Sequence, residues 1–166
     1  MFHFIVVEVD TIRVILERLL ESAQIDSSEV WVWNQADLPA TIAEVKIRYH
    51  DGELGDDRPF GDTWKHPVKE QLSREYHINR IIYFMRNPEE IAGVEVDNEC
   101  SYGKYNSFIL PQCAIVDGWH RIAAAIALNL THLDIEYGGR EDIQMWLTGE
   151  SDNPPSEAIS LGCGCP

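Results

Sequence analysis

A strand, a tight turn and a helix follow one another in the sequence IVDGWHRIAAA, residues 115–125. The apolar end of the strand meets Asp117-Gly118, and an alanine-rich helix is predicted to begin at Trp119. The first amide groups of a helix have no partner inside it, and the helix dipole makes that end positive. Asp117 is the predicted N-cap, and Gly118 allows a ligand to approach the backbone closely. The junction is therefore a candidate anion-binding site.

His120 and Arg121 fall in the first turn of this helix. A cation there opposes the dipole, at a cost of up to about 1 kcal/mol. The placement is explained if backbone N–H groups, an imidazole and a guanidinium converge on one phosphate. A plain strand-turn-helix junction, with Arg121 paired to Asp117 or Glu141, explains the spacing equally well. Spacing alone leaves both interpretations open.

Residues 66–86 predict a second helix, which begins at Pro67. Its apolar stripe consists of Ile78, Ile81, Ile82 and Met85. A neighbouring strip carries a basic or imidazole side chain every three residues, at Arg74, His77 and Arg80. This strip is either a solvated edge that pairs with Glu70 and Glu75 or a set of groups directed at an anion.

The sequence DGWHR and the alanines after it, residues 117–125, resemble the DG-x-HR signature of the ParB/sulfiredoxin-like superfamily. The segment HINRI, residues 77–81, and the strand expected at 93–96 agree with this resemblance, which covers about residues 41–149. The superfamily includes CTP-dependent chromosome-partitioning proteins, a sulfinic-acid reductase, a nucleotide-dependent serine kinase, and plasmid proteins described as ATPases, nucleases or suppressors of oncogenicity. The resemblance implies a small α/β domain that binds nucleotide phosphates.

The chain differs from members of the superfamily in two respects, and each difference argues against one of their functions. Trp119 stands where sulfiredoxin has its reactive cysteine, so reduction of sulfinic acids is not expected. The chain is acidic and has no room for a helix-turn-helix DNA reader, so stable binding to duplex DNA is not expected either.

The resemblance then implies an Mg²⁺-dependent enzyme that hydrolyses or transfers the γ-phosphate of ATP or CTP. Its catalytic residues would be His120, Arg121 and Glu53. Its nucleotide-binding residues would be Asp117, Gly118, Trp119, His120, Arg121, His77 and Arg80.

A loop rich in glycine and aspartate, HDGELGDDRPFGDTW, occupies residues 50–64. Long loops of this kind are often functional and sometimes merely mobile. Their carboxylates suit Mg²⁺, which prefers oxygen ligands. The candidate metal ligands are Asp51, Glu53 and Asp56, and one of them could instead be the general base.

Two competing functions stay open beside this enzyme. The chain has 166 residues, with 13 Lys and Arg against 28 Asp and Glu, a formal charge of −15. Such a surface suits a non-enzymatic interaction protein that mimics nucleic-acid charge and inhibits a basic protein partner of a mobile element. The resemblance also allows a nuclease, which the negative charge disfavours.

The sequence predicts a cytoplasmic protein without a membrane anchor. No apolar run reaches the roughly 18 residues of a membrane span, and the N-terminus MFHFI lacks the features of a signal peptide. Of the four cysteines, Cys163 and Cys165 are close together near the end and match no zinc pattern. They are expected to be free thiols, with a soft-metal or redox pair as the alternative.

The expected fold is α/β or α+β, with a small mixed sheet and flanking helices. We expect an N-terminal strand-helix-strand extension over 1–40, a ParB/sulfiredoxin-like domain over 41–153 and a flexible tail over 154–166. The predicted strands are 2–9, 29–34, 41–49, 91–96, 108–116 and 132–137. The predicted helices are 11–24, 66–86, 119–129 and 140–147.

Overall fold

The computed structural model describes residues 9–26, 41–57, 74–102 and 107–160. The chain forms two compact units, between which it crosses several times. We call the first the sheet unit, residues 1–25, 93–117 and 131–166. The second is the helical unit, residues 26–92 and 118–130. The predicted mixed α/β class is confirmed, because the described residues contain a five-stranded mixed sheet and several helices.

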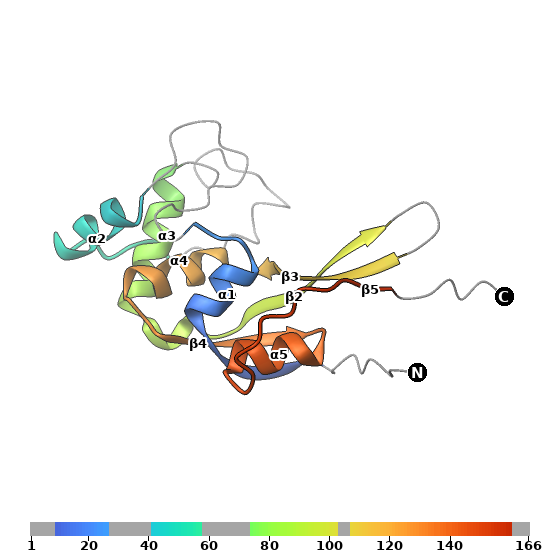
Figure 1. The fold of residues 1–166 in the computed structure, drawn as a ribbon. Helices are drawn as coiled ribbons and strands as arrows, with labels where there is room; N and C mark the ends of the chain where they lie inside the picture. Colours follow the sequence, from blue (N-terminus) through green and yellow to red (C-terminus); the bar gives the residue numbers. More distant parts are fainter. Residues whose placement is uncertain (1–8, 27–40, 58–73, 103–106, 161–166) are drawn as a thin grey trace. The chain divides into compact units, whose positions relative to one another are not determined.

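The sheet has the strand order β1-β4-β2-β3-β5 (Figure 1). Its strands are β1 (Asp10–Ile15), β2 (Val94–Tyr102), β3 (Ser107–Asp117), β4 (His132–Gly138) and β5 (Ile159–Ser160). β4 runs parallel to β2, and every other neighbouring pair is antiparallel. Two helices, α1 (Leu16–Ser22) and α5 (Glu141–Thr148), contact each other and the sheet. The unit therefore has a helical layer packed on a mixed sheet.

Side chains alternate between the two faces of the sheet. On β4, Leu133, Ile135 and Tyr137 are buried, whereas Glu136 between them is exposed. Because successive residues of a strand point to opposite faces, this alternation separates a core face from an outer face.

The beginning of the predicted helix over 11–24 is wrong. Residues 10–15 instead form β1, and the helix is α1, residues 16–22. β1 pairs with β4 in a continuous register from Asp10 opposite Tyr137 to Ile15 opposite His132. β-branched residues favour a strand when a partner strand is present, and that partner lies more than a hundred residues away in sequence.

The tail predicted over 154–166 is also wrong in part. Ile159 and Ser160 form β5, which pairs with Phe108 and Ile109 of β3. Ile159 is buried, so this segment adds apolar contact to the sheet. The segments expected outside 41–153 thus contribute a strand at each edge of the sheet.

The helical unit contains α2 (Ile42–His50), α3 (Arg74–Arg86), the short 3₁₀ helix η3 (Pro88–Glu90) and α4 (Trp119–Ala127). The strand predicted over 41–49 is wrong, because these residues form α2. The Thr41 hydroxyl accepts a hydrogen bond from the Glu44 amide and caps the helix. Ile42 and Val45 are buried one turn apart, a helical spacing that their β-branched side chains obscured.

The predicted apolar stripe of α3 is confirmed, since Ile78, Ile81, Ile82 and Met85 are all buried. The predicted elements β3, α4, β4 and α5 are confirmed within one or two residues at each end. The strand at 91–96 begins at Val94 and continues to Tyr102. Predictions for 2–8, 29–34, 58–73 and the cysteines Cys163 and Cys165 lie outside the described residues. Among those that are described, no helix has the length and apolar character needed to span a membrane.

Candidate functional site

Two histidines meet where α3 and α4 pack together in the helical unit. His77 Nδ1 on α3 lies 2.8 Å from His120 Nε2 on α4. The two rings are nearly parallel, with 16° between their planes and 5.1 Å between their centroids. This distance requires one proton between the two nitrogens, because a neutral imidazole has one donor and one acceptor. Each ring therefore fixes the tautomer of the other.

The surroundings keep both imidazoles neutral. Burial lowers the pKa of His77 from 6.5 to about 4. Burial is also the largest cause for His120, whose pKa falls to about 3, and the positive neighbours Arg80 and Arg121 lower it further. At neutral pH the pair can donate and accept hydrogen bonds but carries no charge.

Two arginines lie beside this pair and share an aromatic neighbour. The guanidinium carbon of Arg80 is 4.5 Å from the centre of the Phe84 ring, and that of Arg121 is 5.3 Å from it. Arg80 donates to the Asp56 carbonyl, and Arg121 donates to the Glu90 carbonyl. We call this group the α3–α4 cluster, which consists of His77, Arg80, Phe84, His120 and Arg121.

The cluster assembles from helical spacing on each side. His77, Arg80 and Phe84 lie at i, i+3 and i+7 of α3, which places them on one face. His120 and Arg121 lie in the first turn of α4. The Arg121 guanidinium and the first backbone amides of α4 are groups of the kind that bind phosphates elsewhere in proteins.

The predicted N-cap of α4 is wrong. Gly118 occupies that position with φ 101°, and no side chain caps the helix. This left-handed conformation favours glycine, which has no Cβ to clash with its own backbone. Asp117 ends β3 and belongs to the sheet unit, whereas Gly118 and the half-buried Trp119 belong to the helical unit.

The acidic loop has a different arrangement from the one the sequence predicted. The Glu53 carboxylate accepts hydrogen bonds from Arg48 Nε and Nη2, the latter at 2.7 Å. This pairing lowers the pKa of Glu53. Asp51 follows α2 as its C-cap, and the Asp56 carbonyl accepts from Arg80.

The residues predicted to bind Mg²⁺ lie within the described residues 41–57. No three His, Cys, Asp or Glu in the described part of the chain are placed to hold one ion. Asp51, Glu53 and Asp56 therefore do not form the expected ligand set there, and Mg²⁺ at this loop stays a prediction.

Sequence reasoning missed Phe84 and Tyr76. Tyr76 is buried, and its ring meets the edge of His120 with 6.2 Å between centroids. Phe84 is four residues after Arg80, a spacing at which an aromatic ring and a guanidinium meet on a helix. That spacing was the available signal for Phe84, whereas Tyr76 carried none.

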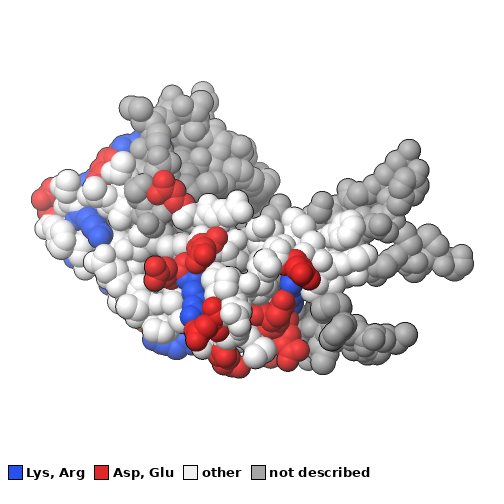
Figure 2. Space-filling model, in the orientation of Figure 1, with Lys and Arg blue, Asp and Glu red and all other residues white. Residues whose placement is uncertain are grey.

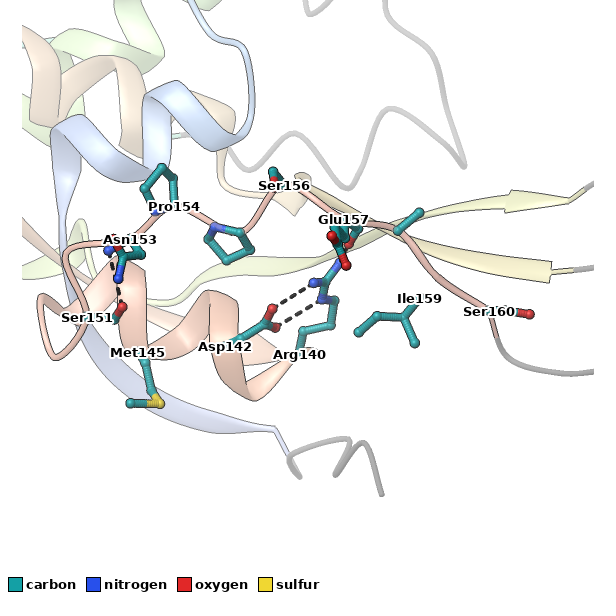
Figure 3. Close-up of a pocket in the computed structure, with 12 residues that line it drawn as sticks. Arg140, Asp142, Met145, Ser151, Asn153, Pro154, Ser156, Glu157, Ile159 and Ser160 are labelled. Carbon is teal, nitrogen blue, oxygen red and sulfur yellow. Dashed lines mark hydrogen bonds and ion pairs between the residues drawn. The ribbon is translucent and has the colours of Figure 1, made fainter. Parts of the chain in front are cut away.

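The sheet unit contains a hollow of about 670 Å³ between α5 and the segment that follows it (Figure 3). Arg140 lies in its wall, 5 % exposed, and pairs with Asp142 at 2.7 Å. Its Nη1 also donates to the Glu157 carbonyl at 2.7 Å. These contacts give Arg140 a structural role, because they hold the segment that leads to β5 in position.

Comparison of the chain with protein-family models, curated proteins and solved structures found no match.

Proposed function

We propose that this protein binds the phosphate groups of a nucleoside triphosphate, ATP or CTP, at the α3–α4 cluster. We further propose that it hydrolyses or transfers the γ-phosphate, as the resemblance to the ParB/sulfiredoxin-like superfamily implies. The observation that carries the proposal is the convergence of Arg80 and Arg121 on one Phe84 ring beside the His77–His120 pair.

The charge distribution supports an anionic ligand. The chain carries a formal charge of −15, yet Arg121 in the first turn of α4 and Arg80 on α3 both lie over the Phe84 ring. Arg121 and the helix dipole repel each other in the absence of an anion, at a cost of up to about 1 kcal/mol. A bound phosphate would turn this repulsion into attraction for both.

Each residue of the cluster has a distinct proposed role. Arg80 and Arg121 stabilise charge on the phosphate oxygens, as positioned cations do in phosphoryl transfer. When His120 Nε2 accepts a hydrogen bond from His77 Nδ1–H, the neutral His120 ring carries its own hydrogen on Nδ1 and can donate it to a phosphate oxygen. His77 is then a positioning residue, and Phe84 holds the two guanidiniums in place.

Magnesium enters this proposal as part of the nucleotide complex. The described residues do not assemble a protein ligand set for it, and Mg²⁺ is commonly held mainly by substrate phosphates. We therefore assign no reaction step to a protein-bound metal ion.

The first test is thermal denaturation with ATP, CTP and GTP, with their diphosphates and with Mg²⁺ added or omitted. A ligand at 100 times its Kd stabilises the folded state by about 2.7 kcal/mol. We expect one triphosphate to stabilise the wild type and to lose this effect in Arg121→Ala. Arg13→Ala is the matched control, because it removes an exposed arginine of the sheet unit.

Either of two results would overturn the binding proposal: no nucleotide stabilises the protein, or Arg121→Ala keeps the full stabilisation. Phosphate release then tests the catalytic part separately. Binding without turnover would leave a nucleotide-binding protein and remove the hydrolase or transferase assignment.

A further inference from the structure

The outer face of the sheet unit carries a row of like charges across three strands. Glu95 of β2 lies opposite Glu136 of β4 in the parallel register. Glu95 also lies opposite Asp117 of β3 in the antiparallel register. All three residues are exposed, so their carboxylates occupy neighbouring positions across β4, β2 and β3. Asp97 follows on the same face of β2.

This row disfavours folding. Like charges directly opposite each other on adjacent strands are destabilising, because their Cβ atoms are only about 5 Å apart. The described part of the sheet unit contains three arginines, and each pairs with another carboxylate: Arg13 with Asp134, Arg18 with Asp152 and Arg140 with Asp142. The contribution of these carboxylates to folding stability therefore does not explain why they lie side by side.

A β-bulge adds an apolar side chain to the same face. Val96 lies opposite Ile115 and Glu95 lies opposite Asp117, so Val116 is an extra residue on β3. Bulges redirect a side chain, and Val116 is 62 % exposed. Val9, which precedes β1, is 69 % exposed and lies against Gly138 of β4.

Together these residues line a hollow of about 370 Å³. Its lining consists of Val9, Glu95, Val96, Asp97, Val116, Glu136 and Gly138. Carboxylates thus surround exposed aliphatic side chains on a sheet face.

We infer that this outer face binds a basic, partly apolar segment of another protein. Lysine or arginine side chains of that segment pair with Glu95, Glu136 and Asp97, and an aliphatic side chain enters the hollow between Val9 and Val116. Charge complementarity selects this partner, because the row repels nucleic acids and nucleotides. The inference does not depend on nucleotide binding by the helical unit.

Two other cationic occupants fit the face less well. A metal ion needs converging ligands, and the described residues do not provide such a group. A small polyamine would pair with the carboxylates but would leave the exposed valines in water.

The test uses three labelled peptides with the full-length protein in fluorescence anisotropy. One alternates lysine and valine, the second alternates lysine and serine, and the third alternates glutamate and valine. We expect the lysine–valine peptide to bind most tightly, with an affinity that falls as salt is added. The Val116→Ser variant should lose the preference for lysine–valine over lysine–serine.

The matched control must distinguish binding at this face from general attraction to an acidic surface. Figure 2 shows that Asp and Glu side chains also gather around α1 and α5, so any basic peptide will be attracted weakly to the whole unit. We expect Glu95→Gln with Glu136→Gln to weaken lysine–valine binding about tenfold, whereas Glu17→Gln with Glu21→Gln on α1 changes it less than about twofold. Equal weakening by the two pairs, or none by either, would overturn the inference.

A second measurement checks the premise without any peptide. Glu95→Gln removes a charge that is repelled on both sides, so we expect its melting temperature to rise above that of the wild type. A lower melting temperature would show that Glu95 stabilises the sheet, and the inference would lose its basis.

Discussion

His77 Nδ1 on α3 and His120 Nε2 on α4 are 2.8 Å apart, so one hydrogen bond joins the two helices. The His77 imidazole is buried, and the His120 imidazole is half-buried. The bond exists only while the pair holds a single proton between the rings. Protonation of both nitrogens would place two N–H groups against each other, close to two arginines.

The stability of the protein should therefore fall on mild acidification. The pKa of His77 is lowered to about 4 and that of His120 to about 3, from 6.5. The unfolded chain binds more protons than the folded one in this window, so the contribution is complete above pH 6.5 and is lost as pH falls toward 4. Each unit of pKa difference corresponds to about 1.4 kcal/mol.

Urea denaturation between pH 4 and 7 measures this effect. Carboxylates contribute in the same range, so the informative quantity is the difference between the wild type and His77→Gln. We expect the difference in unfolding free energy to shrink as pH falls. A difference that does not vary with pH would mean that the pair does not titrate as described.

Gly55 is expected to tolerate no side chain. It has φ +83°, and a Cβ there would clash with the Tyr83 amide nitrogen and lie 2.6 Å from the Asn79 carbonyl oxygen. Both neighbours belong to the backbone of α3, which cannot move aside cheaply. Gly55→Ala should therefore lower the unfolding free energy by about 3 kcal/mol, the upper end of what overpacking costs.

Gly52 is the matched control for Gly55. Its φ is +93°, but nothing lies within 4 Å of a Cβ at that position. Gly52→Ala should lower the unfolding free energy by only about 1 kcal/mol, the cost of the left-handed conformation. Similar losses in the two variants, measured by urea denaturation, would contradict the close approach of residue 55 to α3.

Asn98 supports a buried polar network in the sheet unit. Its Oδ1 accepts hydrogen bonds from the Tyr137 hydroxyl and from the Arg140 amide, each at 2.8 Å. Asn98→Ala should cost about 2 kcal/mol of unfolding free energy, because it leaves the buried Arg140 amide without this acceptor, whereas the Tyr137 hydroxyl keeps the Arg140 carbonyl as an acceptor. Tyr137→Phe removes one donor and should cost about 1 kcal/mol. Equal effects would contradict this assignment.

Glu53 provides a test of the acidic loop. Because Arg48 holds both of its carboxylate oxygens, we expect Glu53→Gln to leave nucleotide-dependent thermal stabilisation within about twofold in Kd, a change of under about 0.5 kcal/mol. Arg121→Ala, measured alongside, should abolish it. Loss of turnover in a Glu53→Gln protein that still binds nucleotide would instead identify Glu53 as the general base.

The local sequence was sufficient where one pattern of residues had one structural solution. β3, the turn at Gly118, α4 and β4 were predicted because alternation, a glycine and an alanine-rich helical stripe follow one another without ambiguity. The prediction failed over 41–49, where β-branched residues hid a capped helix. It also failed over 10–15, where a helical spacing of apolar residues was overridden by pairing with β4.

The candidate site also has features that local sequence predicts and features that only tertiary packing decides. The first-turn position of His120 and Arg121 and the strip of His77 and Arg80 follow from helical periodicity, which is a property of neighbouring residues. Their convergence does not, because His77 and His120 are 43 residues apart and only the packing of α3 against α4 brings their nitrogens together. The same holds for the row of Glu136, Glu95 and Asp117, because strand register is set by pairing between distant segments. Local chain chemistry thus specified the elements and the residue types, whereas tertiary packing alone specified which of those residues meet.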